Sequence, residues 1–412
     1  MNIALFEDAG FLNLLPLVWL RACFELRCGR DLLVDKVRQH AGGRVARLIV
    51  RPQLSELVHD RTPLDPAVDG ENWCLLNART MFVGDALLPR MGSAWVLNGS
   101  LVAVVLPPDE ARALDESLVR DEGRLEKWLG NFRVERPPAE VRLISYPWDL
   151  ILANGPELMR QCRDGGVQAG RVYAGAHLLN SAAIHVGEGA VVKPGAVLDA
   201  EAGPIHIESD VLIQPNAVLE GPCFVGARSI VRPGAVLRAG TTIGPVCKVG
   251  GEIESSVVQG HSNKQHDGFL GHSFVASWVN LGADTVTSDL KNTYGSIRVS
   301  INGVGVESGQ HFLGAIVGDH TKTGIGTILP TGGVLGICAN VFTHSGVPKF
   351  VPSFAWLTEQ GLTRYRIEKA LDIARTVMAR RDVELTPGEE ALLRACEQEA
   401  FEVEAAGWAG RV

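Results

Sequence analysis

A six-residue repeat of aliphatic side chains is the feature that most limits how this chain can fold. Between residues 186 and 249 every sixth position is aliphatic, apart from one short insertion at 201–204. Pro-Gly or Pro-Asn pairs stand between several of these positions, as at Pro194-Gly195 and Pro215-Asn216. The repeated positions are Val186, Val192, Leu198, Ile207, Ile213, Leu219, Val225, Val231, Leu237, Ile243 and Val249.

This period predicts a triangular coil of short strands. A strand of about five residues makes one flat face, the Pro-Gly or Pro-Asn pair turns the corner, and the aliphatic residue points to the axis. Successive coils then stack at the strand spacing of about 4.8 Å, so each coil buries its core only against its neighbours. A Gly/Pro-rich β-sandwich is the alternative, but a sandwich does not require a period of six.

Composition excludes several classes of protein. The chain has 412 residues and a formal charge of -8, without a Lys/Arg block, so we expect no nucleic-acid partner. No apolar run reaches the roughly 18–20 residues that span a bilayer, and the N-terminus lacks a signal-peptide pattern. The eight cysteines are scattered, which is typical of buried thiols in a reducing compartment. We therefore expect a cytoplasmic protein that does not act at a membrane.

Residues 1–175 alternate between strand-like and helix-like segments, which predicts an α/β domain with a parallel or mixed sheet. In such sheets nucleotides bind beyond the carboxyl ends of the strands. Arginines suit phosphates, and Asp or Asn suits a metal. Solvated surface charges, a closed turn and a helix N-cap are the alternative interpretations. The candidates for a triphosphate site are Arg21, Arg27, Arg30, Asn77 and Arg79, with Asn154 beside a metal.

Polar residues gather after the repeat, where three histidines lie within residues 261–272. They are His261, His266 and His272, and three interpretations stay open. They satisfy backbone groups in a corner loop, they bind a metal, or one of them is a general base for acyl transfer. A neutral amine must attack the thioester, and histidine has a pKa suited to accepting its proton.

These motifs resemble the variant GlmU-like family of sugar-phosphate nucleotidyltransferase/acetyltransferases. The N-terminal resemblance rests on NIALFED, LLPL with ELRCGR, LLNAR and PWDLILANG, and the C-terminal one on the segment from His266 to VNLGA. The resemblance implies a nucleotidyltransferase-like, Rossmann-like α/β domain followed by a left-handed parallel β-helix. It also implies acetyl-CoA, Mg²⁺ and a homotrimer. The chain departs from the family after its first strand, where Gly10 stands in place of a glycine-rich loop and no lysine follows.

The resemblance also implies roles for individual residues of the β-helix. The catalytic histidine of the family falls on His266, and a backbone group at acetyl-CoA falls on Ala283. The tyrosine of the family falls on Phe269, so its hydroxyl is missing. The positions implied to bind the sugar phosphate are Arg232, Lys248, Lys264, Phe269, Asn280, Lys291 and Asn292, with an uncertain register for the lysines.

The expected organisation has three parts: residues 1–175, a β-helix at 176–350, and a C-terminal extension at 351–412 with two helices. We expect these helices, at 362–381 and 387–405, to cover the open end of the coil, and Arg380 and Arg381 to be solvated. The expected function is acetylation of an amino-sugar 1-phosphate and nucleotidyl transfer from UTP, giving UDP-N-acetylglucosamine or a similar product. Nucleotidyl transfer alone with a structural β-helix, and a non-catalytic trimeric sugar-nucleotide-binding scaffold, remain alternatives.

Overall fold

The computed structural model describes residues 1–163 and 165–408, which form two compact units. Unit 1 comprises Met1–Leu14, Val18–Leu26 and Asp31–Tyr146, and unit 2 comprises Leu15–Leu17, Arg27–Arg30 and Pro147–Val412. The expected boundaries at residues 175 and 350 remain predictions from sequence. By contacts, helix α5 (Pro147–Gln161) groups with unit 2, because it packs on strands of the solenoid.

Unit 1 is built on a six-stranded mixed sheet, as the alternation of segments predicts. The β1 strand pairs in parallel with β4 and β5, whereas β8 runs antiparallel to β5 and β7. In spatial order the strands are β4 (Arg44–Ile49), β1 (Asn2–Phe6), β5 (Trp73–Asn77), β8 (Ser100–Leu106), β7 (Ser93–Leu97) and β9 (Arg133–Glu135).

The helices of unit 1 are short, and the segment 109–128, whose apolar residues have helical spacing, does not form one continuous helix. Asp115 and Asp121 each accept a hydrogen bond from a backbone amide two or three residues later, so each starts a new helical segment. The segment is therefore divided into three. The helices are α1 (Leu33–His40), α2 (Ser55–Arg61), α3 (Pro108–Arg112) and α4 (Glu122–Leu129), with a 3₁₀ turn at Glu116–Arg120.

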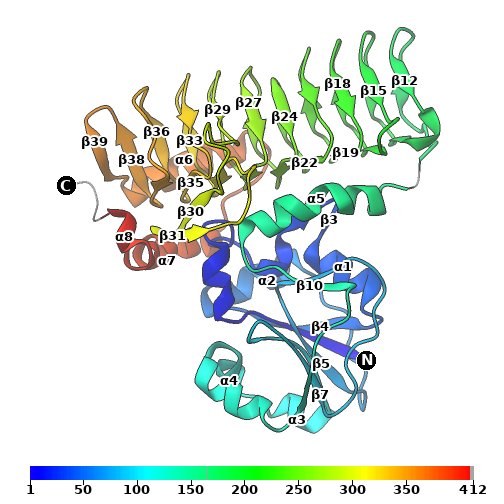
Figure 1. Cartoon of the computed structure of the whole chain (residues 1–412), viewed down its shortest axis with the longest axis vertical. Coiled ribbons are helices and arrows are strands. Elements are labelled where there is room, and N and C mark those ends of the chain that lie inside the picture. Colours follow the sequence, from blue (N-terminus) through cyan, green and yellow to red (C-terminus); the bar gives the residue numbers. More distant parts are fainter. Residues whose placement is uncertain (164, 409–412) are drawn as a thin grey trace. The chain divides into compact units, whose positions relative to one another are not determined.

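Unit 2 is a parallel β-solenoid with three faces, named A, B and C here (Figure 1). Face A comprises β11 (Arg171–Val172), β14 (Val191–Val192), β17 (Leu212–Ile213), β20 (Ile230–Val231), β23 (Lys248–Val249) and β26 (Asn263–Lys264). Face B comprises β12 (His177–Leu179), β15 (Val197–Asp199), β18 (Val218–Glu220), β21 (Val236–Leu237), β24 (Glu252–Glu254) and β27 (Phe269–Gly271). Face C comprises β13 (Ile184–Val186), β16 (Ile205–Ile207), β19 (Cys223–Val225), β22 (Thr241–Ile243), β25 (Val257–Val258), β28 (Phe274–Val275), β32 (Ile316–Val317), β35 (Val334–Leu335) and β37 (Phe350–Val351).

The core of the solenoid consists of the repeated aliphatic residues. From Val186 to Val249, all of them are at most 1% exposed and belong to one hydrophobic cluster. Equivalent residues pair in register from coil to coil, for example Leu198 with Leu219 and then Leu237. The predicted triangular coil is confirmed. Its left-handed sense stays a prediction of the resemblance.

The later coils are interrupted by an excursion and then followed by two long helices. Strands β30 (Arg298–Ile301) and β31 (Val304–Glu307) form an antiparallel hairpin between β29 (Val286–Thr287) and β32. Face A resumes with β33 (Lys322–Thr323), β36 (Asn340–Phe342), β38 (Ala355–Thr358) and β39 (Gly361–Arg364). Strand β34 (Ile328–Leu329) pairs with β29.

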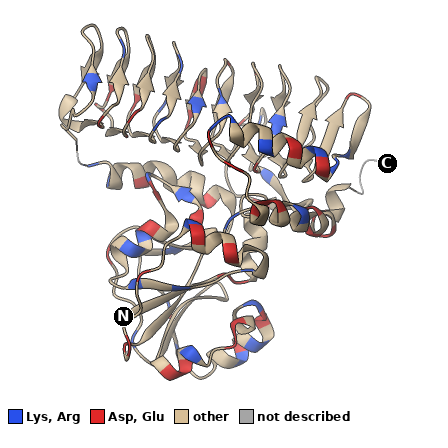
Figure 2. Cartoon of the chain, turned by 180° about the vertical axis from the view of Figure 1, so that it is seen from behind, with Lys and Arg blue, Asp and Glu red and all other residues tan. Residues whose placement is uncertain are grey.

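The C-terminal helices are α6 (Ile367–Ala379) and α7 (Pro387–Val403), followed by the short α8 (Ala405–Trp408). The expected helix start at residue 362 is wrong, because β39 turns back on β38 at Gly361, whose φ of +118° favours glycine. Thr386 caps α7 by accepting from the amide of Glu389, in a reciprocal capping box. Charges of both signs mark these helices, whereas the solenoid strands carry few (Figure 2).

Two observations concern the rest of the described chain. All eight cysteines are buried and free, as their scattered positions predict. Among the described residues, no helix has both the length and the apolar character that a bilayer crossing requires.

Candidate functional site

The outward side chains of face A form a ladder whose character changes along the chain. Val191, Leu212 and Ile230 are followed in register by Lys248 and then by Asn263. Isolated bridges extend this ladder through Asn280 to Lys322. Alternate residues of a strand point to opposite sides, so the sequence that keeps aliphatic residues on the axis also stacks these polar side chains on one outer surface.

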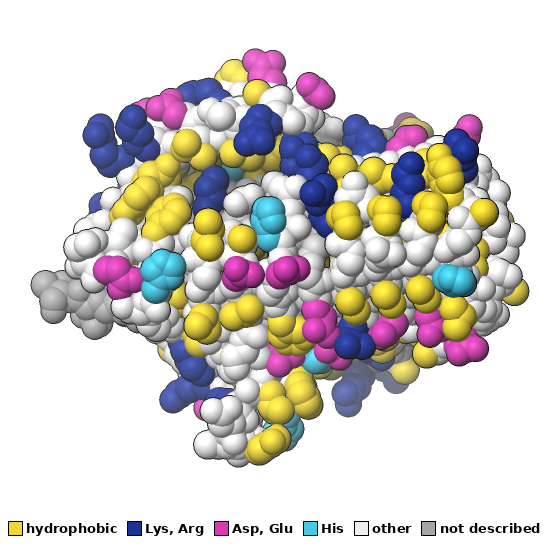
Figure 3. Space-filling model, turned by 90° about the horizontal axis from the view of Figure 1, so that it is seen from above, with side chains coloured by type: hydrophobic (Ala, Val, Ile, Leu, Met, Phe, Trp, Pro, Cys, Tyr) yellow, Lys and Arg dark blue, Asp and Glu magenta, His cyan; other side chains and the backbone are white. Residues whose placement is uncertain are grey.

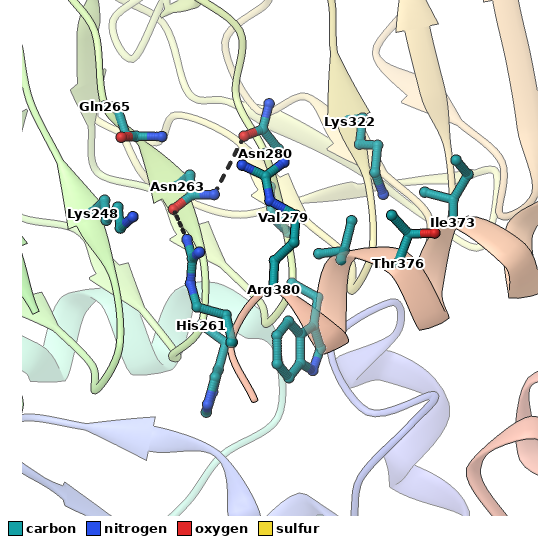
Figure 4. Close-up of a pocket in the computed structure, with 13 residues that line it drawn as sticks. Lys248, His261, Asn263, Gln265, Val279, Asn280, Lys322, Ile373, Thr376 and Arg380 are labelled. Carbon is teal, nitrogen blue, oxygen red and sulfur yellow. Dashed lines mark hydrogen bonds between the residues drawn. The ribbon is translucent and has the colours of Figure 1, made fainter. Parts of the chain in front are cut away.

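Helix α6 covers the polar part of this ladder and encloses a cavity of about 480 Å³ (Figure 4). Arg381, which follows the helix, donates from Nη2 to Oδ1 of Asn263 at 2.9 Å. Arg380 reaches from α6 toward Asn280 (Figure 4). Lys322 donates from Nζ to the carbonyl oxygen of His320 at 2.8 Å. We call this hollow the basic cavity; its lining residues are Lys248, His261, Asn263, Gln265, Trp278, Val279, Asn280, Lys322, Ile373, Thr376, Val377, Arg380 and Arg381.

Burial and neighbouring positive charges lower the pKa values of basic groups in the basic cavity. Burial lowers the pKa of Lys248, and the charges of Arg381, Arg380 and Arg232 lower it further. The pKa of Lys322 is also lowered, chiefly by burial. Burial, then Arg228 and Arg381, lower the pKa of His261 to about 4. The cavity is therefore a region of positive potential that favours an anionic ligand.

Three of the residues predicted to bind substrate meet at this site. Lys248 and Asn280 line the basic cavity, and Arg232 is close enough to act on the pKa of Lys248. The ladder register explains the meeting of Lys248 and Asn280, although fifteen or more residues separate successive contributions along the chain.

Lys264 lies inside the coil instead of on the surface, which corrects its expected role at a phosphate. It pairs with Val249 at the axial position of face A and is 4% exposed. Its Nζ donates to the carbonyl oxygens of Gly250 at 3.1 Å and His266 at 2.9 Å. Burial lowers the pKa of Lys264 to about 8, although Asp267 and Asp284 oppose this effect.

His266 and Phe269 lie just beyond the ladder. His266 is exposed in the corner between β26 on face A and β27 on face B. Phe269 opens β27, where it pairs with Glu252 on face B and is half-buried. His266 is not among the lining residues of the basic cavity, although its chain neighbour Gln265 is, and its catalytic role stays a prediction.

A second hollow, of about 590 Å³, shares Asn280 with the basic cavity. Its other lining residues are Gly282, Thr323, Gly324, Ile325, Phe342, Thr343 and His344. Ala283 follows Gly282, and its carbonyl oxygen accepts a hydrogen bond from the amide of Gly326. The structure places Lys291 and Asn292 apart from both hollows: Lys291 donates from Nζ to the carbonyl oxygen of Ser296, and Asn292 is exposed.

Unit 1 has a cavity of about 910 Å³ at the carboxyl ends of β1 and β5, where such sheets bind nucleotides. Arg79 lines this cavity and Asn77 ends β5, so both lie at the expected edge of the sheet. Both side chains are hydrogen-bonded to Asp8. Nε and Nη2 of Arg79 donate to the two carboxylate oxygens at 2.9 and 2.6 Å, and Nδ2 of Asn77 donates to Oδ2 at 2.8 Å. A Cβ at Gly10 would meet the guanidinium at 2.5 Å, so glycine is needed here.

The charge of this cavity differs from that of the basic cavity. Its charged lining residues are Arg79, Asp8, Glu122 and Glu126, so carboxylates outnumber cations among the residues that the structure describes. The single guanidinium is already paired with Asp8. A triphosphate entering this cavity meets little uncompensated positive charge.

The other three arginines predicted to bind nucleotide are not gathered with Arg79. Arg21 is buried in unit 1, where its carbonyl oxygen accepts from Nη2 of Arg51. Arg27 and Arg30 belong to unit 2, where their backbone amides donate to the side chains of Gln259 and Gln161. Sequence proximity to strand ends suggested a common site, but the chain at 27–30 joins the solenoid instead.

Asn154, expected beside a metal, has its amide group engaged in hydrogen bonds. Oδ1 accepts from the amide of Gly29 at 2.7 Å and from the hydroxyl of Thr242 at 3.0 Å, and Nδ2 donates to the carbonyl of Gly240 at 2.8 Å. The described residues also contain no cluster of three or more His, Cys, Asp or Glu side chains suited to a metal. The environment of Asn154 is structural, and we derive no step through Mg²⁺.

Sequence reasoning missed several residues of the basic cavity. Arg380 and Arg381 were expected to be solvated. Arg380 is exposed and Arg381 is half-buried, and both line the basic cavity. Asn263 and Lys322 were not singled out, because the coil from Lys248 to Asn263 is shorter than three repeats of six and only the observed register aligns these residues. The two arginines follow the end of α6, an amphipathic helix. Only the packing of α6 shows that they line the basic cavity.

Comparisons with known proteins agree with the two-part organisation. Residues 3–163 match the family model described as sugar nucleotidyl transferase. A bifunctional sugar-1-phosphate nucleotidylyltransferase/acetyltransferase of Sulfurisphaera tokodaii is 32% identical over 151 residues, 36% of this chain and 38% of the relative. A bifunctional protein GlmU of Methanococcus vannielii is 30% identical over 183 residues, 39% of this chain and 42% of the relative. The chain thus spans about two fifths of the length of these relatives.

Among solved structures, a UDP-N-acetylglucosamine acyltransferase covers 58% of this chain and 90% of its own, at 15% identity and a TM-score of 0.29. That score is too low for the likeness to carry an argument. The sequence matches agree with the motifs from which a resemblance was predicted. Residues 3–163 are similar to the sugar nucleotidyl transferase family, and the matched part of the chain is similar to the GlmU-type bifunctional relatives.

Proposed function

We propose that the solenoid transfers an acetyl group from acetyl-CoA to the amine of an amino-sugar 1-phosphate, with glucosamine 1-phosphate as the reference substrate. The observation that supports this most is that Lys248 and Asn280 line the basic cavity, with Arg232 near enough to act on the pKa of Lys248 and with Gln265, the chain neighbour of His266, also in the lining. Positive charge in a partly enclosed hollow suits the phosphate. The exposed imidazole of His266 suits the removal of a proton from the amine.

The chemical step balances without a further reactant. The neutral amine attacks the thioester carbonyl, so a carbon–nitrogen bond forms and the carbon–sulfur bond breaks. His266 takes the proton that the nitrogen loses, and the departing thiolate of coenzyme A regains a proton. The phosphate remains fixed by the cationic side chains, which hold the amine in place during attack.

The second hollow offers room for the acyl donor. It shares Asn280 with the basic cavity and lies beside Gly282 and Ala283. Ile325 and Phe342 give this hollow an apolar wall, since they are 69% and 42% exposed. Two adjoining sites that share one side chain suit a reaction in which two substrates meet.

Unit 1 then transfers a nucleotidyl group from UTP or another nucleoside triphosphate to the acetylated sugar phosphate. This releases pyrophosphate and gives UDP-N-acetylglucosamine or a similar sugar nucleotide. The match of residues 3–163 and the cavity at the carboxyl ends of β1 and β5 support this half-reaction. Because Arg79 is paired with Asp8, the geometry supports nucleotidyl transfer less than it supports acyl transfer.

We place the protein in the cytoplasm and propose that it assembles as a homotrimer. Hydrophobic side chains run in rows along the coils, with Lys and Arg beside them (Figure 3). Ile325 and Ile328 are 69% and 62% exposed on the late coils. Exposed apolar rows of this kind mark protein interfaces, and a neighbouring solenoid that covers them would also enclose the second hollow.

An omission experiment tests both half-reactions. Purified protein is incubated with glucosamine 1-phosphate, acetyl-CoA, UTP and Mg²⁺, and thiol and pyrophosphate release are followed separately. We expect thiol release to require the sugar phosphate and acetyl-CoA, and to be lost in His266→Ala while pyrophosphate release from N-acetylglucosamine 1-phosphate continues. Pyrophosphate release without any thiol release would favour a nucleotidyltransferase with a structural solenoid. Absence of both would favour the non-catalytic scaffold.

A further inference from the structure

The basic cavity contains more positive charge than its own lining residues neutralise. Lys248, Lys322, Arg380 and Arg381 line it, and the lining residues that the structure describes include no Asp or Glu. Elsewhere on the same helix pair, arginines are matched with acids, as where Arg375 donates to Asp372 and Glu390. An unbalanced cationic hollow of this kind is costly unless an anion enters it.

One of these cations is held in place with a donor still free for a ligand. Arg381 is anchored through Nη2 to Asn263, whose own Nδ2 lies 3.4 Å from Oδ1 of Asn280. Nε of Arg381 is buried and has no hydrogen-bond partner among the described residues. A buried N–H without a partner is rare in proteins and points to a group that occupies the site.

Two aromatic side chains, His261 and Trp278, also line the cavity. The rings of His261 and Trp278 lie with their centroids 4.4 Å apart, and His320 stacks on Trp278 at 6.2 Å. His261 resists protonation, since its pKa is lowered to about 4. Flat, neutral rings in the same cavity as four cations suit a ligand that carries both a ring and a phosphate.

We propose that α6 is a working part of the binding site, in which Arg380 and Arg381 bind the phosphate ester of the substrate together with Lys248 and Lys322. The helix therefore does more than cover the coil. The identity of the ligand as a sugar 1-phosphate rests on the proposed function, whereas the phosphate site itself does not. The phosphates of coenzyme A share this chemistry, and the test separates the two sources.

Arginine-to-glutamine substitutions measure this contribution. Binding of glucosamine 1-phosphate, glucosamine and coenzyme A to the full-length protein is measured by calorimetry. In the double variant Arg380→Gln/Arg381→Gln we expect the dissociation constant for glucosamine 1-phosphate to rise roughly 10- to 100-fold, the loss typical of hydrogen bonds to charged groups. Binding of glucosamine, which lacks the phosphate, should not change between the proteins.

Two further variants separate a ligand contact from a general effect. Arg375→Gln removes the same charge from the same helix, but on the side that contacts Glu390, and should bind like wild type. Arg380→Lys/Arg381→Lys should restore part of the affinity, because lysine keeps the charge but not the planar fork of donors. If the double glutamine variant has an altered unfolding midpoint, the single Arg380→Gln variant carries the test, since Arg380 is exposed and its loss leaves the Asn263 contact intact.

The possible outcomes are distinct. Selective loss of coenzyme A binding would support the phosphate site and assign it to that ligand. Wild-type affinity for both phosphate compounds in a folded double variant, or no binding of either by wild type, would overturn the proposal. Phosphate binding that depends on the arginines, without acetyl transfer, would keep the site and reject the proposed function. Acetyl transfer with an unchanged KM for glucosamine 1-phosphate in the double variant would keep the proposed function and reject the phosphate site.

Discussion

At the scale of single residues, Lys264 is the clearest departure from the pattern around it. Its position on the axis of face A is aliphatic in the preceding coils, from Val192 through Ile213 and Val231 to Val249. Two backbone carbonyls at the corner hold its ammonium group. These bonds compensate part of the cost of burying a charge, and the remainder appears as a pKa of about 8.

This pKa predicts how stability depends on pH. Lysine has its ordinary pKa near 10.5 when unfolded, so between about pH 8 and 10.5 the unfolded chain binds more protons at Lys264 than the folded chain. Stability therefore rises with pH in this window, and the penalty grows as pH falls from about 10.5 and is complete below about 8. Relative to Lys264→Met, wild type should gain roughly 2 kcal/mol of unfolding free energy between about pH 7 and pH 10.

Urea unfolding across that range checks the prediction. The exposed Lys369 on α6 provides the control, because Lys369→Met should show no such divergence from wild type. A constant difference between wild type and Lys264→Met at every pH would contradict the buried, proton-releasing lysine.

At the scale of elements, helix α5 is tied to the solenoid by one amide. Asn154 joins the backbone of Gly29, the backbone of Gly240 and the hydroxyl of Thr242. These partners come from two distant stretches of the chain, so the position connects helix α5 to a loop at Gly29 and to the coil at 240–242. Asn suits this place because its amide both donates and accepts.

Asn154→Ala should therefore weaken the attachment of α5 whether or not metal is present. It leaves buried backbone groups unsatisfied and should lower the unfolding free energy by about 2–3 kcal/mol. Hydrogen exchange over residues 147–161 should become faster, whereas Leu152→Ala, at a side chain 44% exposed on the same helix, should have little effect. If EDTA accelerated exchange in wild type as much as the substitution does, Asn154 would be acting as a metal ligand after all.

At the scale of the whole molecule, exposed apolar side chains on the late coils require an explanation that one chain does not provide. Ile325, Ile328 and Phe342 are 69%, 62% and 42% exposed. The rows of hydrophobic side chains in Figure 3 run from coil to coil, along the axis of the solenoid. A second solenoid would lie against them in this direction. Assembly would remove this surface from water, at about 25 cal/mol for each Å² buried.

Wild-type protein should sediment with three times the chain mass of 44.2 kDa. Ile325→Glu/Ile328→Glu should dissociate it and abolish acetyl transfer, because buried charges oppose association and the second hollow opens. Pyrophosphate release should persist. Leu87→Glu, at a side chain 92% exposed in unit 1, adds the same charge and should leave the assembly unchanged. A wild-type monomer at micromolar concentration would contradict the proposed trimer.

The sequence predicted the solenoid well because its physics is local and periodic. An aliphatic residue at every sixth position and a turn pair at the corner each act within one coil, and stacking repeats the same contact. Burial of all the repeated positions follows from this. The placement of Lys248 and Asn280 on one surface does not, because the coils between them depart from the six-residue period. The central strands β1, β5 and β8 of unit 1 were also predictable because they are mostly apolar, whereas β9 carries Arg133 and Glu135 and was not expected.

What sequence could not decide depends on contacts between distant segments. Nothing near Arg380 and Arg381 indicates that α6 lies over the ladder, and nothing near Asn154 indicates that Gly29 and Gly240 would reach it. Likewise, Asp8 and Arg79 are 71 residues apart, so their pairing, which removes the free charge of the guanidinium, follows only from the order of the strands. Periodicity determines which side of a strand a residue occupies, whereas only the packed chain determines what that residue faces.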